Sequence, residues 1–416
     1  MKKKLFLSLL ISLECGANIP CQYDSVCDFH SGIAIVKQNG KFGAINTSGT
    51  LVIPIEFDEL YDFNSAGNVV FGKKESEDRI LYGIMSNKGT QILPPTFDFI
   101  SSFINHHAVV CKDGKYGVVD SLGVIRIPVQ FDRIVPYSLH DTDKSGLVAA
   151  VSNGKTGFVD INTGMVSIPF IYDDDLVGIV RFSEGFCALK KDGEYVCIDM
   201  TGNECIRAGW KYISEFNNGT ATATKGSNTY VIDTGGNEIA NLGNVRLLIS
   251  DGRILLAYYG DSRWKVFDNY GIELSQIKCQ SLSFWEQKNL LVVRKKNLLK
   301  KQVVFITDIY GQPICRTVFQ ELGIGSDENC PVKKHGKWGV FSINDKKVTV
   351  PCSYEDIWYF KNGLAHVQRN GKHGFIDNSG KEVIPFNYED AHDMSEGLAA
   401  VKQNGKWGFV CPSACL

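Results

Sequence analysis

The chain has 416 residues, enough for two or three ordinary domains or for one long array of repeats. Hydrophobic residues make up 44% of the composition and charged residues 22%, as is usual for a soluble folded protein. A net charge of -2 gives no electrostatic argument for nucleic-acid binding, which normally needs a basic surface. The many Gly, Phe and Tyr residues favour strands and tight turns over helices.

The first seventeen residues have the layout of a secretory signal peptide. Met1 to Lys4 is basic, Leu5 to Leu13 is apolar, and Cys15-Gly16-Ala17 offers small residues for cleavage. We therefore expect residues 1–17 to be a signal peptide and the protein to be exported to the periplasm, the cell surface or the medium. The alternative is a degenerate first repeat in which Leu5 to Leu13 is a buried strand, and the protein is then cytoplasmic. No apolar run is long enough for a transmembrane segment.

From residue 18 to residue 416 one short motif returns with a period of about 34 residues, lengthened in four copies by five or six. In its clearest form it reads Gly405-Lys406-Trp407-Gly408-Phe409. A fixed period of this size predicts a solenoid or a propeller. The position of Trp407 recurs at Phe42, Tyr82, Tyr116, Thr156, Tyr195, Thr229, Trp264, Val304, Trp338 and His373.

A second motif, apolar-Pro-x-x-aromatic-acid, runs in phase with the first. Its acidic residue is a candidate for chemistry, but a group that repeats at equivalent positions has the same environment each time, whereas catalytic carboxylates need unlike environments. We predict that these carboxylates accept bonds from backbone N–H groups at strand corners. The seven acidic residues are Asp24, Asp58, Asp98, Asp132, Asp173, Glu355 and Glu389.

Each repeat reads as short strands joined by tight turns. In the last full copy, strands are expected at 364–368, 374–377 and 382–384, and a weaker fourth strand at 388–393. Asn370-Gly371 between two of them is a strong hairpin signal. The Gly that follows the aromatic residue, as in Gly43, is expected to let a neighbouring ring lie against bare backbone.

The composite of the clear copies, Gly-Lys-Trp-Gly-Phe then Asp-x-x-Gly-Lys-Glu-Val-Ile-Pro, resembles the WG repeat, also called the KWG repeat. The best copies are Lys337 to Glu355 and Lys372 to Glu389. The resemblance covers about eleven copies, of which those at about 190–330 are degenerate. It implies a β-repeat scaffold, common in bacterial proteins and usually without enzymatic activity. Where Thr156, Thr229, Val304 and His373 replace the aromatic residue, the core is expected to be looser, or an insert to compensate.

The predicted fold is all-β, with tandem antiparallel units that must stack to bury their faces. A propeller-like ring and an open β superhelix both achieve this. The ring is favoured because the repeats begin within a unit, at Ile19-Pro20, and end after the Trp407 strand. The first and last segments can then complete one sheet between them.

The other candidates for chemistry carry no strong signal, and we assign no catalytic, cofactor-binding or metal-binding residue and no cofactor. His106-His107 is interpreted as an exposed loop, and the basic insert Arg294 to Lys301 as a solvated hairpin tip, with contact to an acidic partner as the alternative. The thirteen cysteines include no Cys-x-x-Cys pair, and we interpret them as buried free thiols. Twelve would remain after cleavage of the signal peptide, and this even number keeps disulfide bonds as an alternative. Cys21 and Cys352 share one repeat position, which indicates a structural role.

These observations predict a non-enzymatic scaffold that binds another protein or a cell-envelope polymer through inserts and loops on one face. The alternative is an enzyme whose site lies in the degenerate copies, around Asp173 to Asp308. A deep pocket that gathers unlike polar groups there would favour the enzyme, and a broad shallow face would favour binding.

Overall fold

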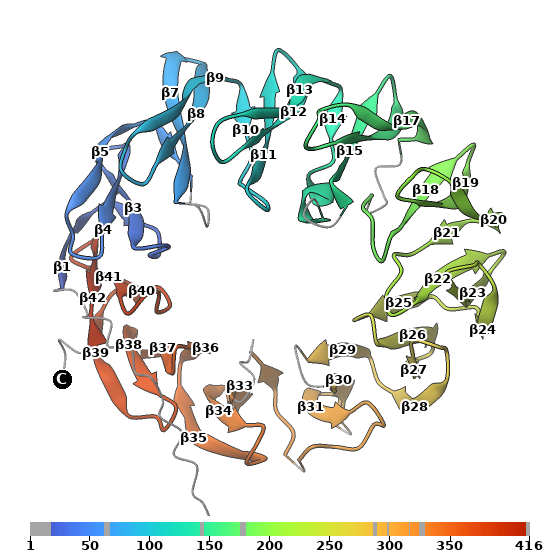
Figure 1. Ribbon diagram of the computed structural model, residues 1–416. Helices are drawn as coiled ribbons and strands as arrows, with labels where there is room; N and C mark the ends of the chain where they lie inside the picture. Colours follow the sequence, from blue (N-terminus) through green and yellow to red (C-terminus); the bar gives the residue numbers. More distant parts are fainter. Residues whose placement is uncertain are drawn as a thin grey trace, which may run out of the picture.

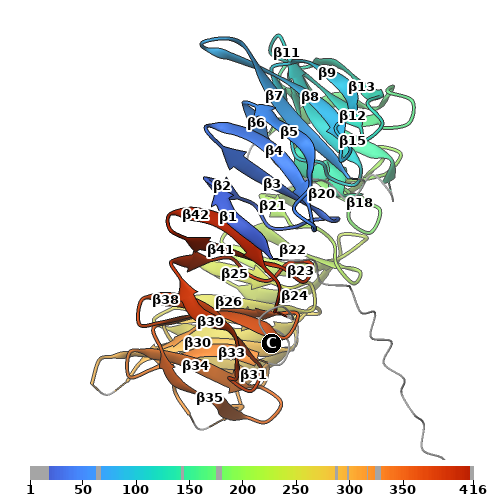
Figure 2. The same ribbon diagram turned by 90° about the vertical axis from the view of Figure 1, so that its left-hand side faces the viewer.

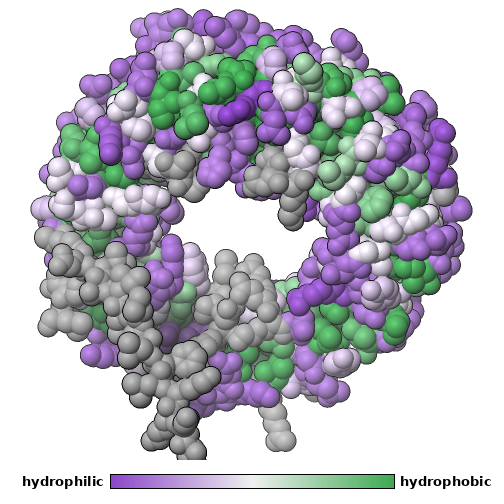
Figure 3. Space-filling view, in the orientation of Figure 1, coloured by the Kyte–Doolittle hydropathy of each residue, from purple (hydrophilic) through white to green (hydrophobic). Residues whose placement is uncertain are grey.

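The computed structural model describes residues 18–61, 67–141, 145–174, 180–285, 289–297, 299–315, 317–323 and 329–412. The expected signal peptide at residues 1–17 lies outside these ranges. In the described part, eleven small antiparallel sheets stand side by side in one closed ring, a β-propeller arrangement (Figure 1). The space-filling view shows an open centre (Figure 3). The structure thus confirms the ring and excludes the open superhelix.

The sheets follow one another in chain order. The first three are formed by β2 (Ser25–Val26), β3 (Ile33–Gln38), β4 (Lys41–Asn46) and β5 (Leu51–Phe57); β6 (Glu59–Leu60), β7 (Asn68–Ser76), β8 (Arg79–Ser86) and β9 (Gln91–Phe97); and β10 (Phe99–Ile100), β11 (His107–Lys112), β12 (Lys115–Asp120) and β13 (Ile125–Phe131).

The next three sheets include one with three described strands. They are formed by β14 (Arg133–Ile134), β15 (Leu147–Ser152), β16 (Lys155–Asp160) and β17 (Val166–Asp173); β18 (Phe186–Lys191), β19 (Glu194–Asp199) and β20 (Glu204–Trp210); and β21 (Tyr212–Ile213), β22 (Thr220–Lys225), β23 (Asn228–Asp233) and β24 (Glu238–Gly243). The 3-10 helix η1 (Pro136–Asp141) joins β14 to β15.

Four further sheets precede the closing one. They are formed by β25 (Leu247–Ser250), β26 (Ile254–Gly260), β27 (Arg263–Asp268) and β28 (Glu273–Lys278); β29 (Ser281–Trp285), β30 (Leu290–Lys296) and β31 (Gln302–Asp308); β32 (Glu321–Leu322), β33 (Asn329–Lys334), β34 (Lys337–Ser342) and β35 (Lys347–Tyr354); and β36 (Asp356–Lys361), β37 (Leu364–Arg369), β38 (Lys372–Asp377) and β39 (Glu382–Tyr388).

The closing sheet is made from both ends of the array. Its order from the centre outward is β40 (Asp390–Ala391), β41 (Ala399–Gln403), β42 (Lys406–Val410) and β1 (Ile19–Tyr23). The blue and red ends of the chain therefore lie together (Figure 2). This is the closure that the sequence predicted: the first and last strands of the array pair with each other, and β42 is paired on both sides.

The innermost strand of most sheets has only two residues, which explains how 34 residues supply four strands. The weak strand expected at 388–393 forms only as Asp390–Ala391. It is also the first strand of the next sheet, and not the fourth of its own. The Asn-Gly hairpins are confirmed, since Asn39 and Gly40 have φ values of 52° and 81°.

The Gly of the repeat motif has a different role from the one expected. A Cβ on Gly339 would lie 2.5 Å from the carbonyl oxygen of Val350, and one on Gly408 would lie 2.5 Å from that of Ile19. The group that approaches the bare backbone at these two positions is the carbonyl before the motif's Pro. Among the motif glycines of the described ranges, the expected ring contact is found only at Gly83, against Phe71, and at Gly157, against Phe170. The pairing register shifts at this point, as between Trp338 and Val340, so the Gly accommodates a β-bulge.

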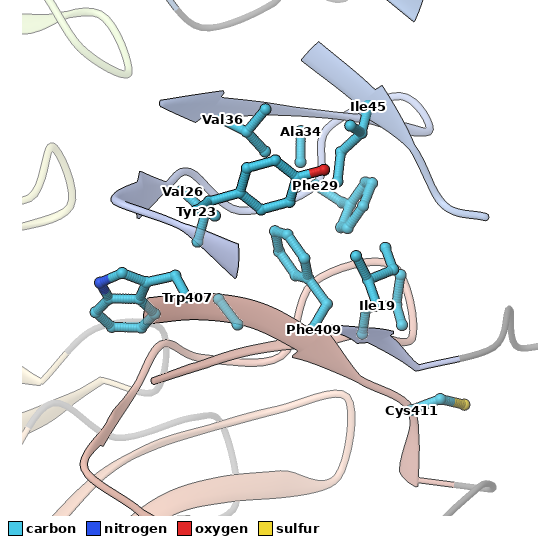
Figure 4. Packing of buried hydrophobic residues seen from close by; sticks show 12 residues of the cluster. Ile19, Tyr23, Val26, Phe29, Ala34, Val36, Ile45, Trp407, Phe409 and Cys411 are labelled. Atoms are coloured by element: carbon cyan, nitrogen blue, oxygen red, sulfur yellow. The ribbon is translucent and has the colours of Figure 1, made fainter. Parts of the chain in front are cut away.

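Hydrophobic cores lie between neighbouring sheets. At the closure, Ile19 and Phe409 pack against Phe29 and Ile45 of the next sheet (Figure 4). Trp407 is 8% exposed, and Lys402, its partner on β41, lies with Nζ 5.8 Å from the ring centroid.

The core is not looser where the aromatic residue is replaced. Thr156, Thr229, Val304 and His373 are all 7% exposed or less. Val304 exchanges two backbone hydrogen bonds with the fully buried Phe319. Phe319 pairs with Val304 as Tyr354 pairs with Trp338 in an intact copy, so the partner of the replaced position is retained.

Candidate functional site

The seven motif carboxylates accept hydrogen bonds from backbone N–H groups, as predicted, and each thereby links its own sheet to the next one. Each accepts a hydrogen bond from a backbone N–H of the hairpin that follows; for Asp132 the donor is Asn153 N at 2.7 Å, and for Glu355 it is Gly371 N at 2.8 Å. The backbone donors to the remaining five are Asn39 to Asp24, Lys74 to Asp58, Asp113 to Asp98, Gly193 to Asp173, and Asn404 and Gly405 to Glu389.

The Lys before the motif's aromatic residue completes this link, a role that sequence reasoning missed. Lys115 Nζ lies 2.6 Å from Asp132 Oδ1, and Lys41 Nζ lies 2.6 Å from Asp58 Oδ1. The lysine bond first, and then the backbone bond, lower the carboxyl pKa at Asp24, Asp58, Asp132 and Asp173. Repeated ion pairs of this kind hold ionised carboxylates in place, which is a structural task.

Four of the eight histidines form two groups of two. His106 is exposed in the loop before β11 and has a φ of 65°, whereas half-buried His107 is the first residue of β11, with its Nδ1 2.7 Å from Asn105 O. A second group was not foreseen: His366 Nε2 lies 2.7 Å from His373 Nδ1, and the His366 ring stacks on Trp358 at 4.0 Å. The residues that the structure describes contain no group of three His, Cys, Asp or Glu that could hold a metal ion.

Most cysteines of the described ranges are free thiols, and Cys411 is disulfide-bonded. Cys21 Sγ lies 3.6 Å from Val401 O, and Cys352 Sγ lies 3.7 Å from Val332 O. The two thiols thus make equivalent contacts with the second strand inward in their own sheets, which fits the structural role expected for them. Burial raises the pKa of Cys197 to about 12, which suppresses its reactivity.

The basic insert forms the extended end of the hairpin β30–β31. Leu299 at its tip is 76% exposed, and Lys295 lies over the Phe305 ring at 4.8 Å. No ion pair joins Lys296, Lys300 or Lys301 to a carboxylate within the described ranges. This geometry fits the solvated tip that was expected.

A cleft of about 480 Å³ opens between the sheets β21–β24 and β25–β28. Their innermost strands, β21 and β25, face the open centre of the ring (Figure 1). Thr222, Leu248 and Leu255 form part of its walls, and Tyr195 and Tyr212 extend it toward the sheet β18–β20. Its polar lining residues are Ser214, Glu215, Asn217, Thr220, Ser250, Asp251 and Asn269.

Both carboxylates of the cleft are already engaged. Arg181 Nε and Nη2 lie 2.5 and 2.7 Å from the two oxygens of Glu215. Asp251 accepts bonds from Arg253 N and Ile254 N at 2.9 and 2.8 Å. The lining therefore offers hydroxyl, amide and apolar surface, with its acidic groups compensated by neighbouring donors.

A second cavity of about 240 Å³ adjoins the first and shares Asp251 with it. It lies toward the next sheet, between Arg253 and Ile254 on one side and Phe284, Trp285 and Leu290 on the other. Both cavities fall within 173–308, the degenerate interval in which the sequence placed a possible site. Sequence reasoning did not identify their residues, because the motif that sets the register is absent there.

The described residues contain no helix long and apolar enough to cross a membrane. Among solved structures, an eukaryotic initiation factor is similar at 13% identity and a TM-score of 0.41, over 74% of this chain and 90% of that one. The computationally designed Ika8 protein is similar at 17% identity and a TM-score of 0.31, over 64% and 93%. BamB from Moraxella catarrhalis is similar at 11% identity and a TM-score of 0.32, over 67% and 95%.

Comparison with curated proteins gives no match. The family described as WG containing repeat matches seven segments, which together span more than half of the chain: 18–42, 42–71, 82–116, 116–155, 157–195, 343–372 and 374–407. These segments are the sheets in which the aromatic-Gly bulge and the Pro-x-x-aromatic-acid corner are clearest. The chain therefore belongs to the family of proteins built from the WG containing repeat.

Proposed function

We propose that the ring is a non-enzymatic binding scaffold whose partner is another protein or a cell-envelope polymer. The observation that carries this proposal is the cleft between β21–β24 and β25–β28, whose lining includes residues of the innermost strands β21 and β25. A closed array with two adjoining cavities between its sheets provides a rigid frame and a distinctive region on it. Repeat arrays commonly use their extended surfaces for binding.

The enzyme alternative places its site in the same interval, so the cleft must be weighed against it. General acid–base catalysis needs a group that is available to exchange a proton with substrate. Glu215 is held by both donors of Arg181, and Asp251 by its own turn, so neither carboxylate is placed for that task. The lining residues include no histidine or cysteine. These features support binding over catalysis.

Exposed apolar side chains on one set of turns also support a protein partner. The turn after the third strand exposes such a residue in two pairs of adjacent sheets: Leu122 at 75% and Met165 at 71%, and Tyr270 at 52% and Tyr310 at 60%. The equivalent turns at 87–90 and 378–381 carry polar residues. Exposed apolar surface of this kind is typical of interaction sites.

We also propose that the protein is exported, on the basis of the residues expected to form a signal peptide. N-terminal sequencing of protein recovered outside the cytoplasm should begin at or near Asn18. Recovery of an intact Met1 in exported protein would contradict cleavage.

Affinity capture from the native organism tests the scaffold. The bait is residues 18–416, and the control is the same chain without residues 407–416, which removes most of β42 and opens the ring. The proposal expects a protein or polymer that the closed ring retains and the opened ring does not. Turnover of a captured small molecule would instead establish the enzyme alternative, and retention of nothing would contradict the scaffold.

A further inference from the structure

The loops on the inner side of the ring share one turn conformation and one apolar position. In five sheets the loop between the first and second strands ends in a turn closed by a short bridge, such as His30 with Ile33 or Asn217 with Thr220. The residue just before each bridge is large and apolar, and it fills the space toward the preceding sheet. These five plug residues are Phe29, Phe103, Phe182, Phe216 and Met394.

The preceding sheet also holds the main chain around the plug. Ser183 Oγ donates to Phe216 O at 2.7 Å, and Ser395 Oγ donates to Phe29 O at 2.6 Å. The residue after each serine, Glu184 or Glu396, accepts bonds from the next two turn amides, as Glu184 does from Asn218 N and Gly219 N at 2.8 and 2.9 Å. A plug segment is thus recognised by one apolar side chain, one carbonyl and two amides.

The contact between β21–β24 and β25–β28 lacks this plug. Ser250 stands at the plug position, because the turn that follows it is closed by Asp251 N and Ile254 O, as in the other loops. The turn itself is still held from the preceding sheet, since Asn218 Nδ2 donates to Gly252 O at 2.9 Å. The cleft of about 480 Å³ is therefore the space that a phenylalanine fills elsewhere in the ring.

The cleft retains a polar side chain at the position of the serines that bind the plug segments in other sheets. Asn217 takes the place of Ser183 and Ser395, and it lines the cleft. Its Oδ1 accepts a bond from Asn218 Nδ2, while its own Nδ2 donates no hydrogen bond within the described ranges. That amide is placed to donate to a carbonyl, as the two serines do in their own sheets.

We propose that this cleft binds a peptide segment of a partner protein, which inserts a phenylalanine or leucine side chain between the two sheets and offers a backbone carbonyl to Asn217. The proposal rests on the proposed scaffold function and names the chemistry of its partner. The occupant is argued from the chain itself, because its own loops fill the equivalent spaces in this way. A single buried aromatic anchor surrounded by polar contacts is the usual form of an interface hot spot.

The test uses a peptide that copies the chain's own plug loop, Lys211 to Thr220, with a fluorescent label, titrated with residues 18–416. The matched peptide carries Ala in place of the phenylalanine that corresponds to Phe216. We expect the first peptide to bind and the second to bind at least about tenfold more weakly. Equal binding of the two peptides, or no binding of either at about 1 mM, would overturn the proposal.

Two variants of the ring complete the experiment. Ser250→Phe supplies the missing plug from one wall and Thr222→Phe fills the cleft from the other, so each should abolish binding while raising or preserving the unfolding temperature. Ser353→Phe, on the exposed outer strand β35, should bind the peptide as the unmodified ring does. If one variant fails to fold, the peptide affinity of the other variant decides the test. If a folded variant binds the peptide as tightly as the unmodified ring does, the cleft is not the binding site.

The same variants separate this proposal from the scaffold function. A partner captured by the unmodified ring and equally by Ser250→Phe leaves the scaffold standing and overturns the cleft as its binding site. A partner lost only in Ser250→Phe and Thr222→Phe supports both.

Discussion

Ile19 pairs with Phe409, so that β1 is the outermost strand of the sheet formed by β40, β41 and β42. Three further contacts cross the same junction: Lys406 donates to Asp24, Ser395 Oγ to Phe29 O at 2.6 Å, and Asn18 Oδ1 accepts from Cys411 N at 3.0 Å. The ends of the array are thus joined by strand pairing, by an ion pair and by packing.

Closure predicts that the ring behaves as one cooperative unit. Deleting residues 407–416 removes the partner of β1 and should lower hydrogen-exchange protection in all eleven sheets. An open array would lose protection only in the last sheet and its neighbour, because each repeat would contact only its neighbours. Native-state hydrogen exchange, resolved by peptide, measures the difference.

The two motif tryptophans should differ in their contribution to stability. Trp407 is 8% exposed, whereas Trp338 is half-buried with Lys333 Nζ 5.3 Å from its ring centroid. Trp407→Ala should cost about 3–5 kcal/mol in the free energy of unfolding, as for a large buried ring, and Trp338→Ala less. Urea unfolding of both variants checks this order. Equal losses would show that the half-buried side chain of Trp338 contributes as much to stability as the buried side chain of Trp407.

The repeat and the hairpins could be predicted because their motifs recur many times, and the closure because the first and last segments of the array together make up one unit. A phase shared by the Trp407 motif and the Pro-x-x-aromatic-acid motif fixes where each strand begins. The bulge at Gly408 was not foreseen in detail, because a carbonyl such as that of Ile19 comes from a strand that pairs across the ring closure. Sequence proximity gives no information on such a contact.

The cleft could not be predicted for a related reason. Ser250 is informative only when it is compared with Phe29 or Phe216 at the same place in the unit, and that comparison needs the strand register. In the degenerate copies Thr229 and Val304 replace the motif's aromatic residue, and the acidic corner is absent, so the register is lost. The available signal was the large apolar residue four or five positions before the strand that follows the loop, which the motif search did not use.

In the links between sheets, loss of the carboxylate should lower the stability of the ring more than loss of the basic side chain that pairs with it. Asp98 accepts from both Arg79 Nη2 and Asp113 N, each at 2.8 Å, so Asp98→Ala leaves a turn amide and a guanidinium without their acceptor. Arg79→Met removes only an exposed ion pair, which contributes little. The urea midpoint should fall further for Asp98→Ala than for Arg79→Met. The opposite order would mean that the backbone bond to the hairpin contributes nothing.

His392 and Asp28 should make stability decrease above neutral pH. Their side chains lie 3.1 Å apart across the closure, and the bond to Asp28 raises the pKa of His392 above its usual value of about 6.5. A raised folded-state pKa gives stability that is present below the unfolded value and is lost as the pH rises through the folded value. Asp28→Asn should remove this dependence. Unfolding measured from pH 6 to pH 9 checks it, and an unchanged profile would contradict the link.

The buried pair His366 and His373 should instead make the ring sensitive to acid. Burial, followed by the neighbouring His373, lowers the pKa of His366 to about 3. A depressed pKa of a histidine means that the unfolded chain takes up the proton first, so stability is full above about pH 6.5 and falls as the pH approaches 3. The limiting slope for one proton is about 1.4 kcal/mol per pH unit.

His366→Phe tests this directly, because a phenyl ring can keep the stacking on Trp358 and carries no proton. The variant should be less sensitive to acid between pH 6 and pH 4 than the unmodified ring, while Asp28→Asn should leave that part of the profile unchanged. His392 and Asp393, which also lie near this core, are present in both proteins, so their contributions cancel in the comparison. Parallel acid profiles of the two proteins would show that His366 is protonated in the folded ring at little cost, and that its burial does not govern acid stability.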